Sequence, residues 1–133
     1  MKIKPLFFFA SIVICVTSCD PAKILIIKAD SNNSSVTIFG NEQFLPFASP
    51  QASRILKITV SSTDTLRDHK IEYNYGMGNW PNSAISDLVK NIDSIQISTA
   101  NSTYYLRSKP EIEEYLKKHR GGYAGSRLTI KPD

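Results

Sequence analysis

The chain has 133 residues, a length that suits a single domain. Its 41% hydrophobic and 21% charged residues are ordinary globular values, which exclude collagen, a coiled coil and a wholly disordered chain. Two cysteines are too few for a disulfide-stapled miniprotein, and the formal net charge of +4 includes no long basic run. We therefore expect one folded domain without a nucleic-acid partner.

The first feature in chain order is a short apolar segment behind two lysines. Lys2 and Lys4 precede an apolar run over residues 6–16 that only Ser11 interrupts. As a helix this run would extend about 16 Å, whereas the hydrocarbon core of a bilayer is about 30 Å thick. The segment is too short for a stable membrane span, and it predicts a secretory signal peptide.

The residues that close this run, Val16-Thr17-Ser18-Cys19, resemble the lipobox of bacterial lipoprotein precursors. The resemblance covers residues 1–19, with Val16 where Leu is usual and Ser18 where Gly or Ala is usual. It implies that a diacylglycerol is attached to the Cys19 thiol, a strong nucleophile near neutral pH, and that signal peptidase II then cuts just before it.

This resemblance divides the chain into a signal peptide over 1–18, a lipidated tether over 19–22 and one β-rich domain over 23–133. It implies a protein anchored by lipid in the bacterial cell envelope, at the periplasmic face or the cell surface. Cys15 would leave with the signal peptide, so the mature chain would contain no disulfide. The alternatives are a conventional signal peptide cut elsewhere, or an uncleaved anchor.

The domain itself contains short segments with the alternation or apolar runs of β-strands. They lie at residues 23–29, 36–39, 55–61, 71–75, 94–99, 103–107 and 128–130. The alternation is clear over 55–61, where Ile58 and Val60 share one face and Lys57 and Thr59 the other. Residues 100–101 are expected to form the turn of a hairpin.

Two helices interrupt this pattern. Asn82 and Ser83 are expected to cap a short first helix with Ile85, Leu88, Val89 and Ile92 on one face.

The second helix is predicted over 109–120. Ser108 and Glu111 have the spacing of a capping box, and Gly121 offers a stop. The residues at helical spacing on its apolar face are Ile112, Tyr115, Leu116 and His119.

These elements predict a mainly β protein with two short helices, which we interpret as a small antiparallel β-sandwich, immunoglobulin-like in scale. An α+β layered sheet is the alternative, because the order of elements alone does not separate the two. The domain is expected to be a monomer.

No catalytic or metal-binding motif accompanies this pattern. The chain lacks a G-x-S-x-G elbow, and its two histidines, His69 and His119, match no zinc spacing. We interpret His69 as a turn residue and His119 as a helix-end residue. No catalytic residue, metal site or cofactor is predicted.

One segment, residues 73–81, combines two tyrosines, two glycines and the only tryptophan. Tyr73, Tyr75 and Trp80 are candidate ligand-binding residues, because aromatic side chains beside flexible backbone occur in sugar- and protein-binding loops. The competing interpretation, which we favour, places Trp80 in the core, since a small domain needs its large apolar groups inside.

The sequence as a whole predicts a membrane-tethered, non-catalytic binding or interaction module with a protein or glycan partner. The layout resembles that of many small bacterial lipoproteins and carries no activity with it. An inhibitor or immunity-type protein that blocks an enzyme is the alternative, and a small envelope hydrolase ranks below both.

Overall fold

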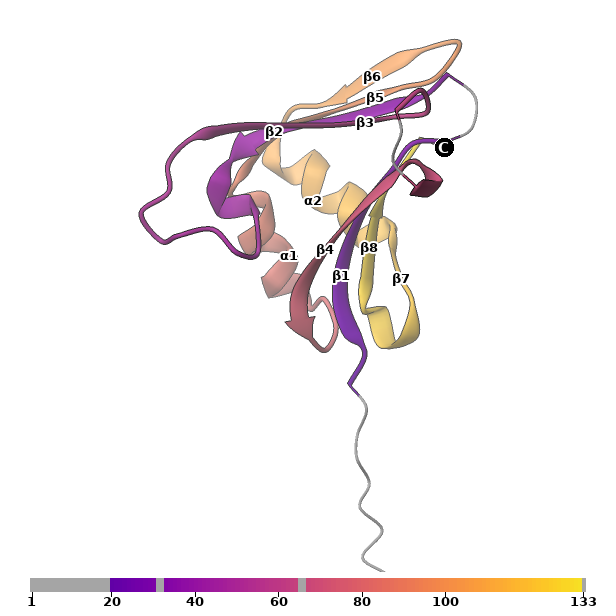
Figure 1. The fold of residues 1–133 in the computed structure, drawn as a ribbon. Helices are drawn as coiled ribbons and strands as arrows, with labels where there is room; N and C mark the ends of the chain where they lie inside the picture. The colour runs from indigo at the N-terminus through magenta and orange to yellow at the C-terminus, as the bar shows by residue number, and fades with distance from the viewer. Residues whose placement is uncertain (1–19, 31–32, 65–66, 133) are drawn as a thin grey trace, which may run out of the picture.

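Two four-stranded sheets enclose two helices in the computed structural model of the protein (Figure 1). The structure describes residues 20–30, 33–64 and 67–132. Sheet A has the order β4 (Lys70–Met77), β1 (Ala22–Lys28), β8 (Arg127–Ile130), β7 (Arg120–Gly121). Sheet B has the order β3 (Ile55–Ser61), β2 (Ser35–Asn41), β5 (Ile92–Ser98), β6 (Thr103–Leu106). The predicted mainly β sandwich is confirmed.

The pairing within the sheets is antiparallel with one exception. β1 and β8 are parallel, and Leu25 lies opposite Leu128. The exception arises because the chain enters β8 beside the start of β1, where the Ile24 amide donates to the Ser126 carbonyl at 2.9 Å. Both strands therefore leave the same end of the domain in the same direction.

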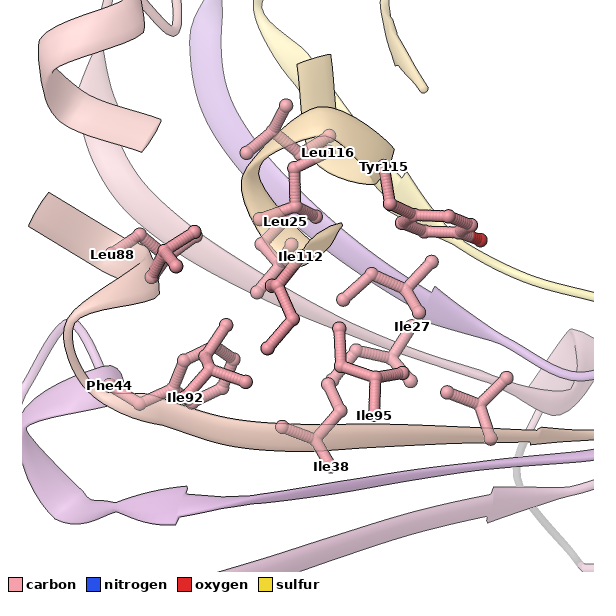
Figure 2. Close-up of a cluster of buried hydrophobic side chains, with 14 of the residues drawn as sticks. Leu25, Ile27, Ile38, Phe44, Leu88, Ile92, Ile95, Ile112, Tyr115 and Leu116 are labelled. Carbon is pink, nitrogen blue, oxygen red and sulfur yellow. The ribbon is translucent and has the colours of Figure 1, made fainter. Parts of the chain in front are cut away.

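Each of the two α-helices carries the chain from one sheet to the other. α1 (Asn82–Val89) joins β4 of sheet A to β5 of sheet B, and α2 (Lys109–Lys118) joins β6 of sheet B to β7 of sheet A. α2 contacts both β5 and β8, so the helices fill the wedge between the inner faces of the sheets. Figure 2 shows Ile112 of α2 between Leu25 of β1 and Ile95 of β5.

One hydrophobic core joins both sheets and both helices. Ile112, Tyr115 and Leu116 of α2 are buried in it, as the helical spacing predicts. The Ser108–Glu111 capping box is also confirmed, with the Ser108 side chain accepting from the Glu111 amide. Fully burying an Ile or Leu side chain contributes about 1.5–3 kcal/mol, so this face holds α2 in the wedge.

Several predicted element ends are wrong. The N-cap of α1 is Pro81, without a side-chain hydrogen bond, because the Asn82 side chain instead accepts from Arg120. Ile92 begins β5 rather than extending α1. α2 ends at Lys118, and Gly121 lies in β7, a two-residue strand too short to show alternation in the sequence.

Three short 3₁₀ helices complete the fold: η1 (Glu42–Phe44), η2 (Arg67–His69) and η3 (Tyr123–Gly125). Among the described residues no helix is both long enough and apolar enough to span a bilayer. The predicted signal peptide and Cys19 lie outside the described residues.

Candidate functional site

The face of sheet B that points away from the core is an extended polar surface, which we call the outer face. Figure 1 shows both helices beneath sheet B and no described element above it. Strand alternation and register place on this face Ser35, Thr37, Phe39, Ile55, Lys57, Thr59, Ser61, Ser94, Gln96, Ser98, Thr103 and Tyr105. Most of these side chains carry a hydroxyl or amide group.

Register aligns these side chains in rows across the four strands. Thr59, Thr37, Gln96 and Tyr105 lie opposite one another in succession, and the Thr37 and Thr59 hydroxyls are hydrogen-bonded at 3.1 Å.

The neighbouring row runs through Ser61, Ser35, Ser98 and Thr103, in which Thr103 donates to the Ser98 hydroxyl at 3.1 Å. Because the strands hold these rows in place, the hydrogen-bonding groups are organised before any ligand arrives.

Two cation–aromatic pairs lie on the outer face beside these rows. The Lys57 ammonium lies 5.7 Å from the centre of the Phe39 ring, and the Arg107 guanidinium lies 4.4 Å from that of Tyr105. Such pairs contribute about 0.5–1 kcal/mol at exposed sites and hold each cation at the surface.

The outer face has a positive charge balance. Lys57 and Arg107 are its two cations, and the one acidic residue of the described β2, β3, β5 and β6 strands is Asp93, which is exposed at the edge of this face. Asp93 occupies the bulge at the start of β5, with its carboxylate 3.9 Å from the Lys109 ammonium. The outer face therefore combines hydrogen-bonding rows with two cations, groups that can attract a polar, acidic partner.

Trp80, the centre of the aromatic segment, is only 2% exposed and belongs to the core, as expected. Its indole N–H donates to the Ile24 carbonyl at 3.1 Å, and the Tyr75 ring meets it edge-on at 5.0 Å. The Lys23 ammonium lies 5.0 Å from the centre of the indole ring. Trp80 therefore offers no open ring face on which a sugar could stack.

The two tyrosines of the segment pack against the connection between β2 and β3. The Tyr75 hydroxyl donates to the Phe44 carbonyl, and burial, followed by the nearby Tyr73, raises the Tyr75 pKa. Tyr73 contacts the rings of Phe44 and Phe47, and burial raises its pKa as well. Both phenols therefore stay neutral at physiological pH and serve packing.

A hollow of about 300 Å³ lies beside this segment and brings Tyr75 and Trp80 together, but not Tyr73. Two of the polar side chains that line it already have partners within the protein. Gln43 donates to two backbone carbonyls of the 45–54 connection, and Asp87 accepts from Lys90 at 3.0 Å. The hollow is thus a weaker candidate than the outer face.

Each of the two histidines lies against another side chain of the fold. His69 lies 3.6 Å from the Asp64 carboxylate, and the His119 ring stacks on Tyr115 at 4.0 Å. The described part of the chain contains no group of three or more potential metal ligands. Cys19, the predicted lipidation site, lies outside the described residues.

No protein-family model, curated protein or solved structure matches this chain. Sequence reasoning missed the outer face as a site, although the alternation over 55–61 already places Lys57 and Thr59 on one side of a strand. Their row partners are not detectable without the register.

Proposed function

We propose that this protein is a lipid-anchored lipoprotein of the bacterial cell envelope whose domain binds a partner without catalysis, through the outer face of sheet B. The observation that supports this proposal is the pair of polar rows on the outer face, flanked by the cations Lys57 and Arg107. The anchor is supported by the lipobox-like residues that end at Cys19.

The chemistry of the outer face favours an anionic glycan as the partner. Ser, Thr and Gln side chains can exchange hydrogen bonds with sugar hydroxyls, and they lose little conformational entropy when strands already hold them. Lys57 and Arg107 add attraction for carboxylate or phosphate groups, and Arg can pair with such groups through two hydrogen bonds. Tyr105, which is 45% exposed, adds a rigid contact area.

A glycan titration tests the binding function. We expect calorimetry to detect binding of an oligogalacturonate, an acidic sugar polymer, and no binding of neutral dextran. The interaction should weaken steeply with salt, since exposed charges are screened. The double variant Lys57→Ser, Arg107→Ser should lose it.

Substituting two exposed lysines, Lys90 just after α1 and Lys118 at the end of α2, gives the matched control, because Lys90→Ser, Lys118→Ser changes the net charge equally away from the outer face. If both double variants bind equally, or dextran binds as well as the acidic polymer, this binding mode is wrong. A tight one-to-one complex with an envelope enzyme that survives Lys57→Ser, Arg107→Ser would favour the inhibitor alternative.

The anchor is tested separately in cells. A fatty-acid analogue should label the wild type and Cys15→Ala, because Cys15 is expected to leave with the signal peptide. Cys19→Ala should remain unlabelled. Equal labelling of Cys19→Ala and the wild type would contradict the lipoprotein assignment.

A further inference from the structure

One end of the domain, which we call the tether end, gathers the start of β1, the end of β4 and the loop that contains η3. Backbone hydrogen bonds join these segments: Gly78 to Pro21 at 2.7 Å and Ile24 to Ser126 at 2.9 Å. Residues 1–19 connect to the domain here, through Asp20. In Figure 1 the tether end is at the bottom, and sheet B lies at the opposite end of the molecule.

Two large apolar side chains are exposed at the tether end. Met77, at the end of β4 opposite Ala22, is 66% exposed, and Tyr123 of η3 is 79% exposed. They flank the point at which the chain enters β1. Phe47 and Ile55 are as exposed elsewhere on the domain, so Met77 and Tyr123 are distinguished by their position beside the entry of the chain.

The charges at the tether end are mainly positive. Within residues 20–24, 76–83 and 119–127, the charged side chains are Asp20, Lys23, Arg120 and Arg127. The Arg120 guanidinium is held there by hydrogen bonds to the Trp80 carbonyl and the Asn82 side chain, both at 2.9 Å. With one carboxylate against three cations, the tether end attracts an anionic surface.

The predicted anchor stands very close to this end. Cys19 precedes Ala22, the first residue of β1, by three residues. A fully extended chain spans at most about 3.3–3.6 Å per residue, so an acylated Cys19 can lie only about 10 Å from β1. A tether of this length leaves the domain little freedom to turn another end toward the bilayer.

We propose that the tether end docks on an anionic lipid surface, with Met77 and Tyr123 among the headgroups and the three cations against lipid phosphates. This inference rests on the proposed lipid anchor. Tyrosine is suited to the membrane interface, where its ring lies in an apolar environment and its hydroxyl in a wet one. Basic residues next to the bilayer are attracted to anionic lipids.

Docking in this way orients the rest of the molecule. Sheet B lies at the opposite end of the domain from the tether end, and its outer face points away from the tether end (Figure 1). With the tether end on the bilayer, the outer face would point into the surrounding medium, where a partner could reach it. The anchor and the docked tether end would then fix the orientation of the outer face as well as its location in the envelope.

Depth-dependent fluorescence quenching tests this orientation on the mature protein with its anchor. Once Cys19 is acylated, the thiol in Tyr123→Cys is the only free thiol in the mature chain and can carry an environment-sensitive fluorophore. The matched control is Tyr105→Cys on the outer face. The protein is inserted in phosphatidylglycerol-containing vesicles that carry a nitroxide lipid labelled near its headgroup.

We expect the fluorophore at position 123 to lose most of its emission and the one at position 105 to lose essentially none. Adding Arg127→Glu, raising the salt concentration, or using vesicles of phosphatidylcholine alone should reduce quenching at position 123. Equal quenching at both positions in an acylated protein would overturn the docked orientation and leave the proposed binding function standing. A mature chain whose mass shows no acyl group would overturn the anchor and this inference together.

Discussion

Replacing Leu116 with alanine tests whether α2 holds the two sheets together. The Leu116 side chain is fully buried in the core between the inner faces of the sheets. The substitution removes the equivalent of three methylene groups, worth about 2.4 kcal/mol at about 0.8 kcal/mol each. The cavity left between two sheets and a helix cannot close fully, so the total loss is expected to be about 2–5 kcal/mol.

The assay is urea unfolding, followed by far-ultraviolet circular dichroism and by the fluorescence of Trp80. A single cooperative transition with an unchanged slope would convert the midpoint shift into a free-energy difference. Lys118→Ala, at an exposed position of the same helix, is the control and should change stability by less than about 0.5 kcal/mol. A loss as small as this for Leu116→Ala would refute the packing of α2 in the wedge.

Four further outcomes are expected. Trp80→Ala should destabilise the domain by about 3–5 kcal/mol, whereas Tyr123→Ala should stay within about 0.5 kcal/mol in the same urea assay; the reverse order would place the indole on the surface. Gly40→Ala should destabilise it by about 1–3 kcal/mol, because the added Cβ would lie 2.2 Å from the Asn91 carbonyl oxygen, and an unchanged midpoint would mean that the backbone yields there. Hydrogen bonds from the Ser108 and Arg107 amides lower the Glu111 pKa, so its stabilising effect is present above the ordinary carboxyl pKa of about 4.3 and is lost as the pH falls through the lowered value. Thermal midpoints between pH 6 and pH 2 should therefore decline less for Glu111→Gln than for the wild type, and parallel curves would contradict this reason. Chelator and reductant should leave the thermal midpoint unchanged, and a drop of several degrees with either would reveal a metal or a disulfide.

Local patterns in the sequence were sufficient for the features that depend on neighbouring residues. The Ser108–Glu111 capping box and the buried face of α2 follow from spacings of three and four residues. The hairpin between β5 and β6 follows from two strand-like segments around residues 100–101, and its register places Ser98 opposite Thr103. Such signals can be read locally because the interacting groups lie within one turn or one hairpin.

The ends of several elements did not follow from local patterns. Asn82 has the side chain of a helix cap, but it accepts from Arg120, 38 residues later, and the N-cap of α1 is Pro81, without a side-chain bond. β7 exists because its two residues pair with β8, and nothing in the dipeptide Arg120-Gly121 predicts a strand. In both cases a distant partner outweighed the local preference.

Alternation alone places Lys57 and Thr59 on one face of β3, but only the tertiary structure decided what surrounds them. Thr59, Thr37, Gln96 and Tyr105 form one row because three separate strand pairs share a register. Which strands become neighbours depends on burying both inner faces against the same two helices, a condition that no single segment carries. The outer face therefore exists only once the sandwich has closed, while the apolar run over 6–16 and the lipobox-like residues that follow it to Cys19 can be recognised from the sequence alone.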